Sequence, residues 1–330
     1  MRVARLSIVP LLLISAPATA HTLIEQDALV LEAFAWAQAG YVVADPPDGE
    51  LEGQTYLGMA RLGAQVQYRP WGSAFVQIEG ISGTIQLLDV VAELTPVEFL
   101  AVRAGQFRTP TSADLMIAGP QTPFVNRSIL VDGGFVQQRL AGIEIEGKAD
   151  FGLATGSLRW GVFNPTDTAE NLFQDTHGQF LSARALVDLP SGLHFHLAFI
   201  GLISGDNNPP VGPRPVPFDK ALDTAVYYVH DGWTAYVEGV VDFDGPGAQK
   251  PYAAYIMFLK SVGIEGTPFS IEPGARYEFA KPDGDLLHRI TLGLNLYLIG
   301  DYLNISFNYE LLLGGGETGH ALYGQIQAGF

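Results

Sequence analysis

Two histidines, His194 and His196, are of a residue type and at a spacing that could support catalysis or metal binding. On a β-strand, residues i and i+2 point to the same face, so both imidazoles could join Asp188 or Glu238 in a metal site or an acid–base site. The surrounding segment alternates apolar and polar residues, and a histidine on the polar face of such a strand is more simply a wall residue. We therefore expect no metal, no cofactor and no catalytic residue here.

Paired carboxylates raise the same question at Glu144 and Glu146, which also lie two positions apart. Basic residues oppose them along the chain, so a ladder of charges on a wall is a simpler interpretation than a catalytic dyad. The sequence contains no G-x-S-x-G element, zinc-spaced histidine cluster or phosphate-binding loop. We expect a protein that is not an enzyme, and an enzyme or adhesin built on the same scaffold stays an alternative.

Strict alternation of apolar and polar residues is the signal that recurs along the chain. In residues 55–67 we place Tyr56, Leu62 and Val66 on an apolar face, and Leu57 and Arg61 on the opposite face. Residues 290–298 and 303–311 alternate in the same way. We count about sixteen such segments, each with one apolar and one polar side, which is the pattern of a transmembrane β-barrel.

The connections between these segments alternate between short and long. Short turns are expected at residues 70–73, 95–97, 149–152, 190–192, 231–232 and 300–301, and long loops at 45–53, 108–138, 164–178, 204–223 and 314–319. Short periplasmic turns opposite long external loops are typical of outer-membrane barrels. The fold class is therefore all-β, a transmembrane antiparallel barrel of about 16 strands, and a soluble β-sandwich is disfavoured.

Composition and charge agree with an envelope protein. The chain has 330 residues, no cysteine, 16% charged residues and a formal net charge of −17, which argues against nucleic-acid binding. Residues 1–20 combine Arg2 and Arg5, a short apolar run and an Ala-Thr-Ala end, as in a cleaved secretory signal peptide. After residue 20, no run reaches the roughly 18 apolar residues of a spanning helix. We expect residues 21–330 to form one barrel in a bacterial outer membrane, in contact with lipid and lipopolysaccharide.

A family resemblance rests on two stretches of the chain. The run Gly105-Gln106-Phe107-Arg108-Thr109-Pro110, followed by Phe124-Val125-Asn126-Arg127-Ser128, resembles the strand-to-loop signature of the phosphate-selective porin O and P family. Residues 290–297 and 303–309 look similar too, and the final Phe330 resembles the C-terminal signal that the barrel assembly machinery reads. The resemblance implies a sixteen-stranded barrel, usually a homotrimer, whose loop 108–138 folds inward to narrow a pore.

Charges on the expected lumen face bear on what would pass. We place basic residues on the wall at Arg61, Arg103, Lys148, Arg159, Arg184, Arg276 and Arg289, and acidic ones at Glu79, Asp89, Glu93, Glu144, Glu146, Asp188, Glu238, Asp242, Glu272, Glu278 and Glu310. The excess of acid, 11 to 7, favours cations. Near the long loop, Arg103, Arg108, Arg127 and Arg139 could still form a constriction that attracts anions.

We therefore expect passive diffusion of small hydrophilic solutes or ions through a water-filled barrel. A phosphate-selective or anion-selective pore is one alternative, and a barrel plugged by its own loop is another.

Overall fold

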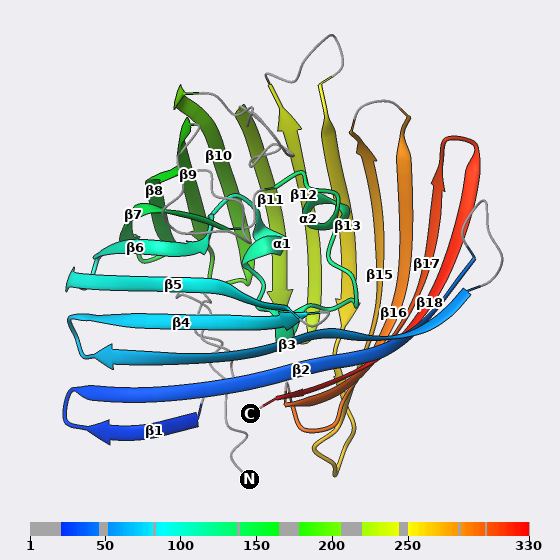
Figure 1. The fold of residues 1–330 in the computed structure, drawn as a ribbon, viewed down its shortest axis with the longest axis horizontal. Coiled ribbons are helices and arrows are strands. Elements are labelled where there is room, and N and C mark those ends of the chain that lie inside the picture. Colours follow the sequence, from blue (N-terminus) through cyan, green and yellow to red (C-terminus); the bar gives the residue numbers. More distant parts are fainter. Residues whose placement is uncertain are drawn as a thin grey trace.

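The computed structural model describes residues 21–45, 52–81, 84–136, 139–164, 178–205, 220–243, 250–282, 285–300 and 302–329 (Figure 1). The expected signal peptide, residues 1–20, and the terminal Phe330 lie outside these ranges. Within them, no helix is long and apolar enough to cross a membrane.

Strands make up almost the whole described chain. They are β1 (His21–Gln26), β2 (Leu29–Asp45), β3 (Glu52–Tyr68), β4 (Gly72–Ile81), β5 (Thr84–Val97), β6 (Leu100–Arg108), β7 (Arg139–Asp150), β8 (Thr155–Asn164), β9 (Gly178–Asp188), β10 (Leu193–Gly205), β11 (Lys220–His230), β12 (Trp233–Asp242), β13 (Tyr252–Lys260), β14 (Val262–Gly263), β15 (Ser270–Lys281), β16 (Leu287–Tyr297), β17 (Leu303–Gly314) and β18 (Glu317–Gly329). Three short helices, α1 (Ala113–Met116), η1 (Gly119–Gln121) and α2 (Ile129–Asp132), lie between β6 and β7.

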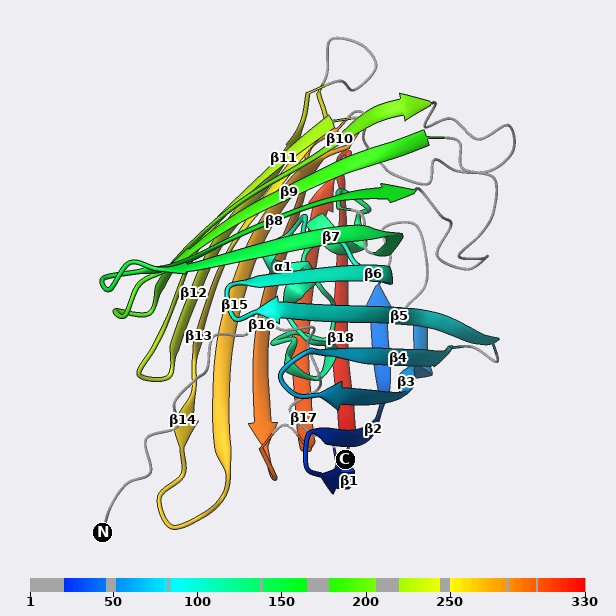
Figure 2. The same cartoon turned by 90° about the vertical axis from the view of Figure 1, so that its left-hand side faces the viewer.

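The strands close into an antiparallel barrel. Each of β2 to β13 and β15 to β18 pairs with its neighbour along the chain, with β13 pairing directly with β15, and β18 pairs with β2 to complete the ring. This closed barrel of 16 strands confirms the predicted fold class and strand number. The short β1 extends the same edge of β2, where β18 faces Trp36–Asp45 and β1 faces Leu29–Ala33 (Figure 2).

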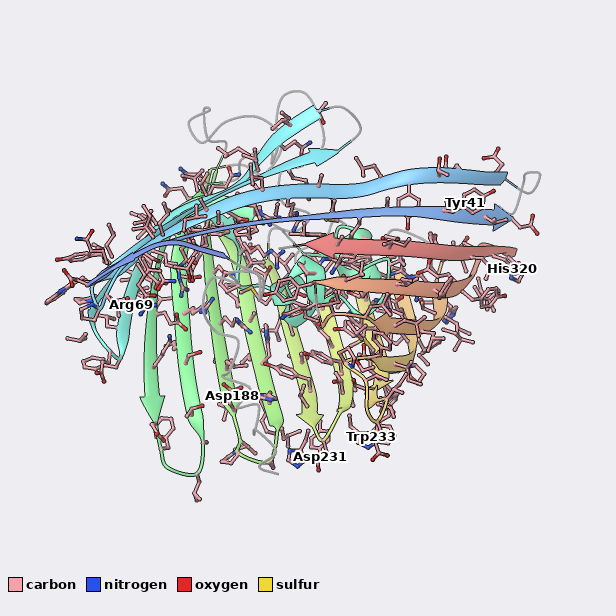
Figure 3. All side chains as sticks on the ribbon, turned by 90° about the horizontal axis from the view of Figure 1, so that it is seen from below. Tyr41, Arg69, Asp188, Asp231, Trp233 and His320 are labelled. Atoms are coloured by element: carbon pink, nitrogen blue, oxygen red, sulfur yellow. The ribbon has the colours of Figure 1, made fainter. Side chains whose placement is uncertain are left out.

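Side chains alternate between the two faces of the wall. On β7, Ile143 is 59% exposed whereas Glu144 is 1% exposed, and on β16, Leu292 is 52% exposed whereas Thr291 is fully buried. Because its outer face is apolar and its inner face is polar, each strand is suited to contact lipid on one side and water on the other. In Figure 3, Tyr41 and His320 lie at the long-loop end of the barrel, and Asp231 and Trp233 lie at the short-turn end.

A β-bulge corrects the facing predicted for the third strand. Gln38 pairs with Met59, but the next residue, Ala39, pairs with Leu57, so Gly58 is an extra residue in β3. The bulge reverses the alternation before it, because side chains have a period of two. Leu57 therefore faces outward with 55% exposure, while Tyr56 points inward and donates a hydrogen bond to Gln325.

The connection between β17 and β18 also differs from the prediction. A long loop was expected at residues 314–319, but only Gly315 and Gly316 separate the two strands. Both have positive φ, 61° and 85°, which is the backbone of a tight two-residue hairpin turn that glycine adopts without steric cost. Gly314 therefore ends β17, and Gly315 and Gly316 form a tight turn instead of a long loop.

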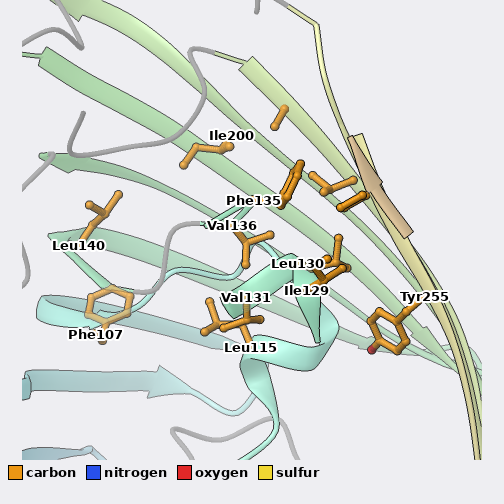
Figure 4. Close-up of a cluster of buried hydrophobic side chains, with 14 of the residues drawn as sticks. Phe107, Leu115, Ile129, Leu130, Val131, Phe135, Val136, Leu140, Ile200 and Tyr255 are labelled. Atoms are coloured by element: carbon orange, nitrogen blue, oxygen red, sulfur yellow. The ribbon is translucent and has the colours of Figure 1, made fainter. Parts of the chain in front are cut away.

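Residues 109–136 lie inside the barrel and carry part of its hydrophobic core. Leu115, Leu130 and Val131 from this segment are buried against Phe107 and Leu140 of the wall (Figure 4). These apolar side chains lie inside the lumen and cannot be buried in lipid. They are removed from water by packing of the segment against the wall. The segment is thus a packed part of the interior.

Candidate pore constriction

Helix α1 begins at a carboxylate of the opposite wall. Glu238, on β12, accepts hydrogen bonds from the Ser112 hydroxyl at 2.6 Å and from the backbone N–H groups of Ala113 and Asp114 at 2.7 and 3.0 Å. The first N–H groups of a helix have no partners within the helix, and a negative charge at that end is favourable. Tyr255 donates a further hydrogen bond to Glu238 at 2.7 Å, so this fully buried carboxylate is fixed on several sides.

Two guanidinium groups bind the other end of α1. Arg108 donates to the carbonyls of Leu115 and Ile117, each at 2.9 Å, and Arg127 donates to the carbonyls of Asp114 and Ile117 at 2.6 and 2.8 Å. These carbonyls lie at the helix C-terminus, where positive charge is favourable, and that of Asp114 also accepts the N–H of Ile117. The single helical turn therefore lies between a carboxylate and two arginines.

The second helix, α2, is attached in the same manner. Glu278, on β15, accepts a hydrogen bond from the N–H of Ile129 at 2.6 Å, and Asp114 accepts two from Ser128. Glu278 also forms ion pairs with Arg276 of its own strand and with Arg289 of the adjacent β16, at 2.9 and 2.6 Å. This carboxylate thus joins the helix start to two cations of the wall.

Main-chain and side-chain contacts continue along the rest of the segment. Asn295 donates to the carbonyl of Pro123, Asn308 accepts from the N–H of Val125, and Gln327 donates to the carbonyl of Pro120. These partners come from β16, β17 and β18, on the side of the barrel away from the strands β6 and β7 that the segment connects. The segment therefore crosses the lumen and is bonded to the far wall.

A narrow cavity of about 50 Å³ lies between this segment and the wall of β2 to β8. Arg61, Arg103, Arg108 and Arg159 line it, together with Asp89 and Glu144. The segment comes closest to the wall at Gly119, where a Cβ atom would lie 2.7 Å from the Trp36 ring. Here only glycine leaves room for the indole and for Arg61, which lies 5.0 Å from that ring.

Arg61 and Arg108, which line this cavity, interact electrostatically with Arg127 and Arg139, which do not line it. Arg108 experiences the positive charges of Arg61, Arg127 and Arg139. Three of the four have carboxylate partners: Arg61 pairs with Glu79, Arg139 with Asp89, and Arg127 with Asp114. The group therefore carries four positive and three negative charges, an excess of one positive charge.

Arg103 belongs to a separate cluster of charges on the wall. Its guanidinium binds Glu93, Glu144 and Glu146 at 2.6, 2.8 and 2.9 Å, and Arg159 pairs with Glu146 at 3.1 Å. Of the four arginines that the sequence placed at the constriction, the structure brings Arg108, Arg127 and Arg139 together with Arg61. Arg103 lies beside them, matched by three carboxylates.

The remaining residues assigned to the lumen wall are found on the strands. Seven of them are largely buried from solvent, Arg61, Glu144, Glu146, Arg159, Arg184, Arg276 and Arg289, while the Lys148 side chain is 38% exposed. The sequence placed Glu238 and Glu278 in the lumen, and considered Glu238 only as a possible partner of the histidines. Only their inward facing could be read from the sequence, because their helix partners are far away in the chain.

The histidines of β10 lie in two different pairs. His194 pairs with Asp188, and His196 lies 3.4 Å from Asp223. Over the ranges that the structure describes, no group of three or more His, Cys, Asp or Glu side chains is arranged to hold a metal ion.

No family model and no curated protein matches this sequence. Among solved structures, the anion-selective porin of Comamonas acidovorans matches with a TM-score of 0.65 at 12% identity, over 92% of this chain and 100% of that chain. OmpF of Salmonella typhi, in complex with daunomycin, matches with a TM-score of 0.62 at 14% identity, over 93% and 99%. The trimer form of OmpT, an outer membrane protein of Vibrio cholerae, matches with a TM-score of 0.62 at 11% identity, over 92% and 100%. At these identities the likeness concerns the fold: the chain has the barrel architecture found in outer-membrane porins.

Proposed function

We propose that this protein is an outer-membrane porin through which small hydrophilic solutes or ions diffuse passively. The observation that carries the proposal is the segment 109–136, which crosses the lumen and leaves beside the wall a cavity of about 50 Å³ lined by arginines. The outer face, rich in exposed apolar side chains, suits contact with lipid and lipopolysaccharide, and barrels of this kind are inserted by an assembly machinery. The described interior offers charged and hydrogen-bonding side chains to a passing solute.

We infer that the arginine group favours anions over a short distance. Arg61, Arg108, Arg127 and Arg139 exceed their three carboxylate partners by one charge, whereas Arg103 and Arg159, which line the same cavity, are exceeded by one by Glu93, Glu144 and Glu146. This local excess opposes the acid excess of the whole lumen. We therefore infer weak anion preference at the constriction.

A dedicated phosphate site, as in the phosphate-selective porin O and P family, has less support. Phosphate recognition needs free guanidinium donors aimed at the oxyanion. Arg127 uses both terminal nitrogens on the carbonyls of Asp114 and Ile117, and Arg108 uses Nη1 on those of Leu115 and Ile117. The contribution of Arg127 is charge and not free hydrogen bonds, so a general anion effect is the better supported selectivity.

The test is the reversal potential of the purified protein in planar bilayers under a KCl gradient. We expect stable conductance steps, and a shift of selectivity toward cations in R127Q but not in R127K, which keeps the charge. R69Q, an exposed change on a short turn, is the matched control. Equal reversal potentials for R127Q and the wild type would remove Arg127 from the selectivity filter. A folded barrel without conductance would favour the plugged or enzymatic alternatives.

We also propose that the porin is a homotrimer. An apolar groove of about 580 Å³ lies on the outer wall of β3 to β7, and small residues such as Ala64, Ala74, Ala92 and Ala104 line it. Small side chains allow the backbone of a second copy to approach closely. Cross-linking in native outer membranes should give a band of three subunits, and a cysteine replacing Ala92 should cross-link between subunits, whereas one replacing Phe307 on the outer face of β17 should not.

A further inference from the structure

A second, larger cavity lies on the short-turn side of α1. Its volume is about 300 Å³, and its lining comes from residues 113–123 of the crossing segment and from the wall between β9 and β16. The wall residues that line it include Asp188, Val229 and Tyr297, each at or next to the short-turn end of its strand. The cavity is therefore a chamber between the crossing segment and the short-turn mouth, with a volume in the range of small-molecule sites.

Part of the lining of this chamber is apolar, beside charged, polar and tyrosine side chains. Met116 and Ile117 face it from the crossing segment, and Leu186, Met257 and Leu259 face it from the wall. The inner face of a water-filled barrel is ordinarily polar. The apolar side chains here are in unfavourable contact with water. A solute with an apolar body would displace that water.

A row of flat side chains runs across one wall of the chamber. His194 pairs directly with Tyr227 and Tyr227 with Tyr236 across adjacent strands, and Tyr236 pairs with Met257. The ring centroids of His194 and Tyr227 are 4.5 Å apart, with an angle of 14° between the planes, and those of Tyr227 and Tyr236 are 4.8 Å apart at 6°. The stack is a rigid aromatic surface, with its hydroxyl groups beside an apolar space.

Arg184 supplies a positive charge at the inner part of the same wall. The residue lines the chamber and is 4% exposed. Its Nε donates to His196 Nδ1 at 3.2 Å, whereas its Nη1 has no hydrogen-bond partner in the described part of the chain. A buried guanidinium nitrogen without an acceptor is costly, and an anionic group would provide one.

Two carboxylates lie in the outer part of the chamber, and their negative charges disfavour a solute with more than one anionic group. Asp188 is paired with His194, and Glu272 accepts hydrogen bonds from Asn295 and Tyr297 at 3.2 and 3.0 Å. Asp188 lies four residues after Arg184 on β9, so the two charges are separated along the strand by about 13 Å. A second anionic group on the solute would face these carboxylates.

We propose that this chamber is a binding site for an aromatic monocarboxylate, with the ring against Tyr227, Tyr236 and Met257 and the carboxylate toward Arg184. A sugar would leave many hydroxyl groups unpaired against the apolar wall, and an inorganic anion would leave that wall in water. The aromatic body accounts for the stack and the apolar lining, and the carboxylate accounts for the unpaired nitrogen of Arg184.

The test is binding of benzoate to the purified detergent-solubilised protein, measured by saturation-transfer NMR and calorimetry. Acetate, which lacks the ring, and benzyl alcohol, which lacks the charge, should each bind about tenfold more weakly or worse. Y236L should weaken benzoate binding about tenfold, whereas Y277L, on the exposed outer face, should not.

R184Q removes the charge and should abolish the advantage of benzoate over benzyl alcohol. Because Arg184 is buried and R184Q could fail to fold, T234W serves as a second variant that fills the chamber and should remove binding. Benzoate binding that survives both Y236L and T234W, or that acetate matches, would overturn the proposal. Benzoate binding is measured without current, so the two proposals can fail separately. A conducting barrel that does not bind benzoate would contradict only the binding site. A barrel that binds benzoate but does not conduct would contradict only the proposed porin function.

Discussion

Several buried carboxylates in this barrel have more than one partner. Glu278 binds Arg276, Arg289 and the N–H of Ile129, and Glu146 binds Arg103 and Arg159. An isolated buried ion is costly, and several hydrogen bonds and ion pairs offset part of that cost. Removing one member of such a group therefore affects selectivity and folding together, which is why conservative variants such as R127K are needed.

One residue in the crossing segment should make selectivity depend on pH. Desolvation inside the lumen raises the pKa of Asp132, whose side chain is 40% exposed, to about 6, against the nearby positive charges of Arg289 and Arg276. Below that pH the carboxyl is neutral, so the lumen beside Arg289 gains one unit of positive charge as the pH falls from 7 to about 5. We expect anion preference to rise over this range, and D132N to be anion-shifted at pH 7 and flat with pH. A wild-type reversal potential that does not change with pH would contradict this assignment.

At Gly105 on β6, the backbone conformation should be needed for folding. Its φ is +132°, and a Cβ there would lie 2.0 Å from the carbonyl oxygen of Val90. The strain and the clash should destabilise G105A by about 1–3 kcal/mol or more. The measurement is the urea midpoint of unfolding in detergent. G147A, on the adjacent β7 with no atom within 4 Å of the added Cβ, is the control and should unfold like the wild type.

Among the elements, α1 and α2 are too short to be stable helices by themselves, so the wall must fix their ends. Glu238 and Glu278 bind the two helix starts, and Arg108 and Arg127 bind the end of α1. The hydrogen-bonding groups that a long helix would satisfy internally are here satisfied by the barrel. The position of the crossing segment is therefore determined by strands far from it in sequence.

Weakening these attachments should loosen the segment without unfolding the barrel. E238Q and E278Q keep the size of each side chain but remove its charge, and each should cost about 1–3 kcal/mol of local stability. We expect noisier single-channel currents with excursions to higher conductance, most pronounced in the double variant. E32Q, on β2 and bonded to Gln67 instead of the segment, should give the steady current of the wild type. Equal noise in E32Q would mean that the carboxylates act through general wall charge.

The strands were predictable because alternation is a local property, and the closed antiparallel barrel of 16 strands confirms that prediction. Local alternation could not reveal the extra residue at Gly58, because a bulge changes the facing without changing the composition. The partners of the helix ends were also out of reach, since Ser112 and Glu238 are 126 positions apart. The role of loop 108–138 as a constriction, and of its arginines as a filter, stays a prediction.

For the whole molecule, two charge distributions compete. The chain carries a formal net charge of −17, which attracts cations to the mouths of the barrel. The arginine group at the narrow opening carries an excess of one positive charge, which favours anions over a short distance. The distance over which each electrostatic field extends decides whether the net acidic charge or the arginine group dominates ion selectivity. That distance is set by the salt concentration.

Ion selectivity should therefore change with salt concentration in a defined direction. The screening length is about 10 Å at 0.1 M and about 3 Å at 1 M, so concentrated salt suppresses the distant acidic field but not charges that border the ion path. We expect the ratio of potassium to chloride permeability to fall as the mean KCl concentration is raised from about 0.05 M to about 1 M at a fixed concentration ratio across the bilayer. In R127Q, which removes the local excess, the ratio should approach one and go no lower. A wild-type ratio that also stops at one would leave the acidic field as the sole source of selectivity, and the constriction would then be electrically neutral.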